Sequence, residues 1–450
     1  MRMNDKSRTH NTIFNALTIV LNFLTRIVFI KAFGENYLGI NGLFSNILSV
    51  LALAELGVSG AIVYCMYKPI VEKDYKHLAA LMNYYKKLYQ TIGIVVAILG
   101  LLVVPFLSVL VNIEANIGNI TFYYLLYLLN TVASYFLVYK TSILTADQKD
   151  YVIKICKVVI SVIQFCVLSI VALQLHNFYI YLLFQIGFSI LNNYICSKVA
   201  ERMYPFINEH VELPQEEKRQ IWNNISSMFS YQIGNVILNN TDNILISVMI
   251  STIVVGYYSN YSMIVAAIST FIQLIFGSVT ASIGNLVAEG NESKQRDIFN
   301  VLQLMSFWVT SFSVICFCVL FQDCISILYT THYLLNYDIV IVCAFNFYIV
   351  NILYPIYCYR NTVGLFKDTK MIMLFTSLIN LVLSIILGKV IGLFGILVAT
   401  GLSRILTNFW FEPIKLFKKY FKASVFPYFL KQIISAVLTV ILCAFMVKIA

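Results

Sequence analysis

Residues 225–249 read ISSMFSYQIGNVILNNTDNILISVM, and the interpretation of the whole chain starts from this stretch. It is long enough to cross a bilayer, because a helical span needs about 20 residues. Amides and a carboxylate at membrane depth cost several kcal/mol unless they face protein or a water-filled cavity. The stretch nevertheless contains Gln232, Asn239, Asn240, Asp242 and Asn243. We therefore expect this helix to line a polar pathway between the two halves of a transporter.

The composition is that of an all-α polytopic membrane protein. The 450 residues are 60% hydrophobic and 12% charged, with a mean hydropathy of +0.82. The formal charge of +10 is not evidence of a nucleic-acid partner, because basic cytoplasmic loops already account for such a surplus of Lys and Arg. We expect no nucleic-acid partner. The first apolar run contains Arg26 and leads into a second run without a small-residue cleavage site, so we expect it to remain as a signal anchor.

Apolar runs predict about 13 transmembrane spans. They divide into an N-terminal lobe at 1–196, a polar cytoplasmic linker at 197–222, a C-terminal lobe at 223–411, and a loop with one additional span at 412–450. Each lobe has six spans. The spans are placed at 11–33, 38–66, 88–111, 120–139, 155–175, 178–196, 225–249, 256–283, 299–321, 338–359, 371–387, 391–411 and 426–447.

The distribution of Lys and Arg predicts a cytoplasmic N-terminus. Cytoplasmic loops collect basic residues, and the alternate loops assigned to the inner side contain nearly all of them, including Arg360 and Arg404. The outer loops at 112–119, 175–177 and 322–337 contain none. A shift of about 217 residues also lays the second half over the first, which predicts the internal repeat that many transporters have.

Three charged residues lie well inside predicted spans: Arg26, Glu55 and Asp242. At about 1.5 Å of rise per residue, Arg26 and Asp242 each lie roughly 10 Å from the outer end of their helices, whereas Glu55 lies roughly 25 Å down. We expect Arg26 and Asp242 to form a gate or coupling pair between the lobes, in which Arg26 attracts an anionic substrate and Asp242 binds a cation or a proton. A static ion pair that fixes the helix register is the alternative.

Two further patterns carry weaker expectations. Residues 67–90 alternate basic and apolar residues at helical spacing, which is typical of an interfacial helix or of a basic inner loop with snorkelling lysines. The many tyrosines are expected mostly in aromatic belts at the membrane surfaces.

No nucleotide-binding, zinc-protease or other catalytic motif occurs, so we predict no enzyme activity, no cofactor and no metal centre.

Several segments in chain order resemble the Wzx-type flippases, which are the polysaccharide transport branch of the multidrug/oligosaccharidyl-lipid/polysaccharide superfamily. They are YLGINGLF at 37–44, LGVSGAI at 56–62, LTADQK at 144–149, NTDN at 240–243, GYYSNY at 256–261, SIGNL at 282–286 and GLFKD at 364–368. The resemblance implies two MATE-like six-helix lobes in a bacterial cytoplasmic membrane. It also implies alternating access, translocation of an undecaprenyl-diphosphate-linked oligosaccharide, and coupling to H⁺ or Na⁺.

Three alternatives remain. A multidrug exporter of the same superfamily would share the architecture, and a cationic drug would favour acidic residues without Arg26. A lipid II flippase would have more cavity arginines, and a membrane polymerase would need a larger outer loop than 322–337. One departure from the resemblance is that close relatives have fourteen spans, whereas this chain has about thirteen. We expect a monomer in contact with membrane lipids.

Overall fold

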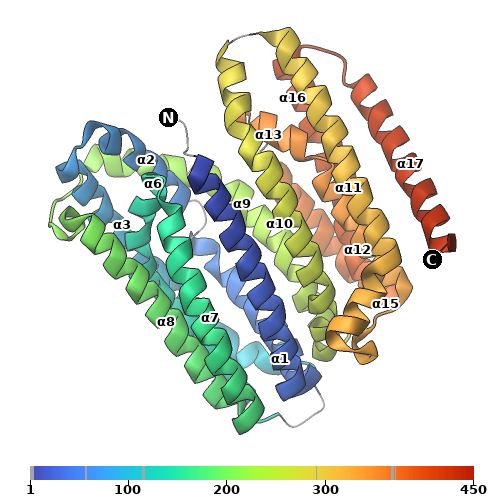
Figure 1. Cartoon of the computed structure of the whole chain (residues 1–450), viewed down its shortest axis with the longest axis horizontal. Helices are drawn as coiled ribbons and strands as arrows, with labels where there is room; N and C mark the ends of the chain where they lie inside the picture. Colours follow the sequence, from blue (N-terminus) through green and yellow to red (C-terminus); the bar gives the residue numbers. More distant parts are fainter. Residues whose placement is uncertain are drawn as a thin grey trace. The chain divides into compact units, whose positions relative to one another are not determined.

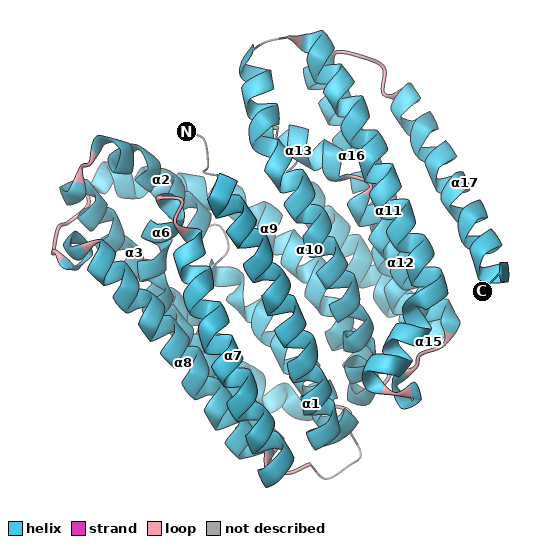
Figure 2. Cartoon of the chain, viewed as in Figure 1, coloured by secondary structure: helices cyan, strands magenta, loops and turns pink. Residues whose placement is uncertain are grey.

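The computed structural model describes residues 5–55, 58–113, 117–289, 291–365, 369 and 371–449. Within these residues the chain is mostly helical, with short loops between the helices, and contains no strand (Figure 2). Ten of the described helices are long and apolar enough to cross a membrane. The predicted all-α polytopic class is therefore confirmed.

The chain divides into two compact units, Met1–Val236 and Ile237–Ala450, and each is described here by itself. Both are bundles of long helices joined by short connections (Figure 1). The helix α9 (Gln215–Met249) begins in the first unit and ends in the second. The first unit contains α1 (Asp5–Leu51), α2 (Val58–Glu72), α3 (Tyr75–Val103), α4 (Leu107–Leu110), α5 (Ile120–Val138), α6 (Ser142–Ala146), α7 (Asp150–Leu175) and α8 (Phe178–Met203). The second unit contains α10 (Thr252–Glu289), α11 (Glu292–Tyr329), α12 (Tyr337–Asn351), α13 (Tyr354–Thr362), α15 (Ile372–Leu406), α16 (Asn408–Leu416) and α17 (Phe426–Ile449).

The ten apolar helices overlap twelve of the predicted spans, because two of them contain sharp internal bends, although the second span ends at Leu51 rather than at residue 66. The helix α1 bends at Gly34, where φ is 76°, between the first two predicted spans. The helix α15 bends at Ile391 and Gly392, the first two residues of the twelfth predicted span. The remaining predicted span is in α9, which is helical but too polar to be among the ten.

The helix α15 is an antiparallel hairpin. Its two arms are joined by side-chain hydrogen bonds, from Asn380 Nδ2 to Thr400 Oγ1 at 2.9 Å and from Ser384 Oγ to the Ile396 carbonyl at 3.5 Å. At the turn, Gly392 has φ 60° and ψ −139°, a conformation that is open almost only to glycine. A Cβ on Gly395 would lie 2.2 Å from the Leu387 carbonyl oxygen, so the backbones of the two arms nearly touch.

In the first unit, the loops predicted for the inner side gather at one end and those predicted for the outer side at the other. Asn83 Nδ2 donates to the Glu209 carbonyl at 2.5 Å, and Lys149 Nζ donates to Tyr204 Oη at 3.1 Å. At the opposite end, Tyr37 Oη donates to the Ile117 carbonyl at 3.3 Å. The loops therefore alternate as predicted, and which end faces the cytoplasm stays a prediction.

Two local expectations are wrong. Residues 67–90 form no separate interfacial helix, because α2 continues to Glu72, α3 begins at Tyr75, and Leu78, Leu81 and Met82 are buried inside the bundle. Several tyrosines assigned to surface belts are instead interior residues. They are Tyr123, Tyr124, Tyr127, Tyr261 and Tyr359.

The polar segment predicted as a linker at 197–222 is mostly helical. The helix α8 extends to Met203 and α9 starts at Gln215, so only a short segment with a 3-10 turn at Pro205–Asn208 separates them. The assignment of the two lobes to 1–196 and 223–411 stays a prediction.

Candidate functional site

Asp242 lies in the second unit against the second arm of the α15 hairpin. Its carboxylate is buried, with 8% of the residue exposed, and its Oδ2 accepts a 2.7 Å hydrogen bond from Thr400 Oγ1. Thr400 in turn accepts from Asn380 Nδ2, which also donates to Ser384 Oγ at 3.3 Å. A chain of polar side chains therefore runs from α9 through both arms of α15.

This cluster, Asp242, Asn380, Ser384 and Thr400, contains two oxygen atoms that lack a hydrogen-bond donor among the residues that the structure describes. Among the described residues, Asp242 Oδ1 and Asn380 Oδ1 are buried and have no hydrogen-bond partner. A buried acceptor without a donor is costly and needs an explanation, such as a proton or an ion that is not part of the fold. One carboxylate, one amide and two hydroxyl groups are suitable hard oxygen ligands for a small cation. Within the described chain, no group of three or more His, Cys, Asp or Glu side chains could hold a metal ion.

A second polar contact joins the same two helices one turn away. Arg404 Nη2 donates to Asn239 Oδ1 at 3.1 Å. Residue 404 lies one helical turn after residue 400, and residue 239 lies one turn before residue 242. The helix α9 and the second arm of α15 therefore run antiparallel and are joined by two hydrogen-bonded pairs. The assignment of Arg404 to an inner loop is wrong, because α15 continues to Leu406 and Arg404 is only 7% exposed.

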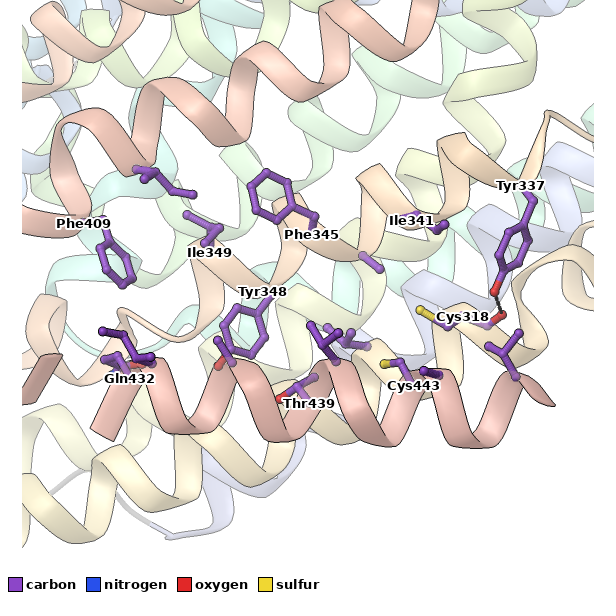
Figure 3. Close-up of a pocket in the computed structure, with 18 residues that line it drawn as sticks. Cys318, Tyr337, Ile341, Phe345, Tyr348, Ile349, Phe409, Gln432, Thr439 and Cys443 are labelled. Carbon is purple, nitrogen blue, oxygen red and sulfur yellow. Dashed lines mark hydrogen bonds between the residues drawn. The ribbon is translucent and has the colours of Figure 1, made fainter. Parts of the chain in front are cut away.

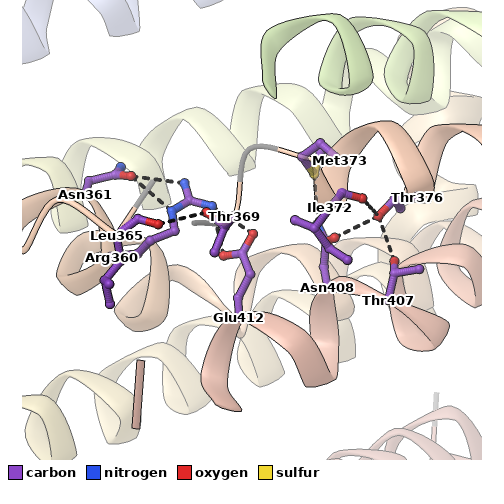
Figure 4. A network of polar contacts seen from close by, with 10 residues as sticks. All are labelled: Arg360, Asn361, Leu365, Thr369, Ile372, Met373, Thr376, Thr407, Asn408 and Glu412. Atoms are coloured by element: carbon purple, nitrogen blue, oxygen red, sulfur yellow. Dashed lines mark hydrogen bonds and ion pairs between the residues drawn. The ribbon is translucent and has the colours of Figure 1, made fainter. Parts of the chain in front are cut away.

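A buried ion pair that the sequence did not indicate joins α13 and α16 (Figure 4). Arg360 Nη1 donates to Glu412 Oε1 at 2.8 Å and to Oε2 at 2.9 Å. Arg360 also donates to Asn361 Oδ1, and its guanidinium lies 5.0 Å from the centre of the Tyr357 ring. The expectation that Arg360 lies in a loop is also wrong, because Arg360 is part of the helix α13 and is only 6% exposed.

Arg26 and Glu55 lie in the first unit. Arg26, in α1, interacts electrostatically with the hydroxyl groups of Tyr127 and Tyr181. Tyr127 Oη also donates to Asn41 Oδ1 at 3.0 Å, so one of the two tyrosines near Arg26 is held by an amide. Glu55 lies in the 3-10 turn Ala52–Glu55, where its Oε1 accepts a 2.6 Å hydrogen bond from Tyr89.

The other predicted residues differ in position. Gln232 lies in the part of α9 that belongs to the first unit, whereas Asn239, Asn240 and Asn243 lie in the second. Asn243 is buried, and its Oδ1 has no hydrogen-bond partner in the described part of the chain. Arg26 and Asp242 belong to different units, so their pairing as a gate stays a prediction.

An apolar cavity of about 610 Å³ lies between α17 and the rest of the second unit. Figure 3 shows Phe345, Tyr348 and Ile349 on one side and Thr439 and Cys443 of α17 on the other. Cavities of this size accommodate ligands of several hundred daltons, and an apolar lining selects hydrocarbon.

No protein-family model and no curated protein sequence matches the chain. Solved structures do match its fold. An inward-facing MATE-family multidrug resistance transporter of the MOP superfamily is 13% identical with a TM-score of 0.68, over 88% of this chain and 94% of that one. The lipid II flippase MurJ, in an inward closed conformation, is 17% identical with a TM-score of 0.62, over 97% and 98%. A MOP-superfamily transporter from Pyrococcus furiosus is 14% identical with a TM-score of 0.57, over 93% and 97%. The chain therefore has the fold of MOP-superfamily transporters.

Proposed function

We propose, from the fold that this chain shares with MOP-superfamily transporters, that it is a flippase of the bacterial cytoplasmic membrane. Its cargo is an undecaprenyl-diphosphate-linked oligosaccharide, moved between leaflets by alternating access. A gradient of Na⁺ or H⁺ supplies the energy, because the sequence contains no nucleotide-binding motif.

The observation that carries this proposal is the buried carboxylate of Asp242 with its donor-free Oδ1. A carboxylate at membrane depth that faces protein marks an ion pathway in many transporters. Asp242 would accept a proton, or bind Na⁺ together with Asn380, Ser384 and Thr400. The bound cation would offset the cost of the buried charge.

Two features support an anionic, lipid-linked cargo. The buried Arg404 and the partly buried Arg26 would favour a diphosphate over a cation. The apolar cavity beside α17 is the type of surface that an isoprenyl chain requires. A multidrug exporter is the second candidate, since the acidic Asp242 could also attract a cationic drug and the fold matches a multidrug transporter.

Reconstituted proteoliposomes test both candidates. One arm measures translocation of a fluorescent undecaprenyl-diphosphate-linked disaccharide, and the other measures uptake of ethidium. Each is measured with an inward Na⁺ gradient, with a pH gradient, and with neither. We expect gradient-driven movement of the lipid-linked probe, a loss of at least tenfold in Asp242→Asn, and no loss in Asp323→Asn, which removes an exposed acid of the same unit.

The outcomes separate the candidates. Ethidium transport without movement of the lipid-linked probe would replace the flippase by a drug exporter. Movement of the lipid-linked probe that is equal with and without gradients, and equal in Asp242→Asn, would reject ion coupling at Asp242.

A further inference from the structure

Arg404 is a buried cation whose hydrogen bonding is incomplete. The residue is 7% exposed, and its Nη2 donates to Asn239 Oδ1 at 3.1 Å. Among the described residues, its Nε is buried and has no hydrogen-bond partner. Leaving a donor of a buried charged group unpaired is costly, so a purely structural arginine would normally complete this bond.

The acidic groups near Arg404 are already engaged elsewhere. Arg404 interacts electrostatically with Asp242 and with Glu412. Glu412, however, receives both of its short hydrogen bonds from Arg360, and Asp242 Oδ2 receives one from Thr400. The charge of Arg404 is thus offset by two carboxylates, but the short hydrogen bonds to both carboxylates come from other residues.

We infer that Arg404, together with Asn239, binds a phosphate group of the cargo, and that a cation at Asp242 strengthens this binding. The inference rests on the proposed function and deepens it. A cation beside Asp242 cancels the negative charge that faces Arg404, so the guanidinium is left with an excess positive charge in a low-dielectric environment. An anion that binds there restores neutrality.

The chemistry of the Arg404 side chain fits a phosphate. Guanidinium groups offer adjacent N–H donors that match two phosphate oxygens, and Asn239 lies beside them as the acceptor of one of these donors. Asn239 is exposed, so the contact between Arg404 and Asn239 is accessible from the Asn239 end, while Arg404 itself is buried.

Coupling of this kind is reciprocal, which makes it measurable without transport. If a cation raises the affinity for the anion, the anion raises the affinity for the cation by the same factor.

The probe is farnesyl diphosphate, with farnesol as the control for binding of the hydrocarbon tail alone. Binding is measured by calorimetry on the full-length protein in detergent, in NaCl or choline chloride of equal ionic strength, at pH 6 and pH 8.

We expect Na⁺ or the lower pH to tighten binding of the diphosphate by about fivefold or more, within the usual range of such couplings, with no effect on farnesol. Arg404→Gln should abolish this gain. Asp242→Asn, which removes the negative charge permanently, should bind the diphosphate as tightly without the cation as the parent does with it. Lys389→Gln, which removes a basic residue from the same hairpin, should behave like the parent.

Two results would overturn the inference: diphosphate binding that is unchanged in Arg404→Gln, or binding in the parent that neither cation alters. Both can be distinguished from failure of the proposed function. Suppose that the parent moves the lipid-linked probe under a gradient, and that Arg404→Gln binds farnesyl diphosphate as well as the parent does. The proposed function then stands, and only this role of Arg404 is rejected. Thermal unfolding of each variant shows whether a loss of binding reflects a loss of folding.

Discussion

Arg360 binds both carboxylate oxygens of Glu412 although the two residues are 52 positions apart in the chain. The pair fixes two short helices, α13 and α16, each of which follows a break in a longer helical segment. Because neither side chain is exposed by more than 8%, the two charges depend on each other for compensation.

Removal of one partner should therefore destabilise the second unit strongly. Glu412→Gln leaves Arg360 without its counter-ion, and we expect a loss of about 3–5 kcal/mol, seen as a lower midpoint of thermal unfolding in detergent. Replacement of both residues by Met should recover most of this loss. The matched control is Glu72→Gln, because the exposed pair of Glu72 with Lys68 should contribute almost nothing. Equal midpoints for Glu412→Gln and Glu72→Gln would contradict the prediction.

The hairpin of α15 should tolerate no side chain at Gly395. An added Cβ would meet the Leu387 carbonyl oxygen at 2.2 Å, and a backbone atom on the facing arm cannot rotate away. We expect Gly395→Ala to cost about 1–3 kcal/mol or more and to lower the yield of folded protein in gel filtration. Gly401→Ala should cost less, because its contacts are side-chain atoms of Phe345 and Asn346. Gly277→Ala, which meets no atom within 4 Å, serves as the neutral control.

Thr400 should be needed for stabilisation by the coupling cation. If the cation binds at Asp242, adding it raises the midpoint of unfolding, because the ligand binds the folded state. We expect Thr400→Val to lose this shift, since valine has the same shape but no hydroxyl for Asp242, and Thr400→Ser to keep it. A shift of the same size in Thr400→Val would argue against this oxygen as part of the cation site.

The LTADQK segment at 144–149 should contribute to stability through Lys149. Lys149 Nζ lies 2.7 Å from Asp147 Oδ2 and donates to Tyr204 Oη, and Asp147 accepts a 2.5 Å bond from Tyr204. The hydrogen bond to Asp147 raises the pKa of Lys149 above its usual range. A raised lysine pKa stabilises the fold below the unfolded value of about 10.4, and this contribution disappears as the pH rises through the higher folded value.

We therefore expect the difference in unfolding midpoint between the parent and Lys149→Gln to be constant from pH 7 to about pH 10 and to shrink above that. Lys73→Gln, at an exposed turn of the same unit, is the control. A difference that stayed constant above pH 10 would show that Lys149 contributes through packing rather than through its charge.

Hydropathy was sufficient to place most of the helices. The start of α5 at residue 120 and the bends at Gly34 and Gly392 fall where the apolar runs begin or break. Asp242 was also evident, because a carboxylate in an apolar run is unusual in any membrane segment. Glu55 was found for the same reason, although its partner Tyr89 was not.

The remaining site residues carry no local signal. The positive-inside pattern assigns every arginine near a span end to a loop, so Arg404 and Arg360 were counted as topology markers rather than as buried charges. Their burial follows from how far α15 extends and from how α13 packs on α16, both of which are tertiary properties. Glu412 precedes Pro413 near the end of a predicted span, and only its pairing with Arg360 distinguishes it from a loop acid.

The buried charges of the second unit also bear on how the protein responds to membrane voltage. Asp242, Arg404, Glu412 and Arg360 carry two negative and two positive charges. A movement that carried all four together would displace no net charge through the membrane field, where each elementary charge is worth about 2.3 kcal/mol per 100 mV. These four residues would then add almost no gating current of their own, so the electrical work done in the second unit would come from the bound ion and the cargo.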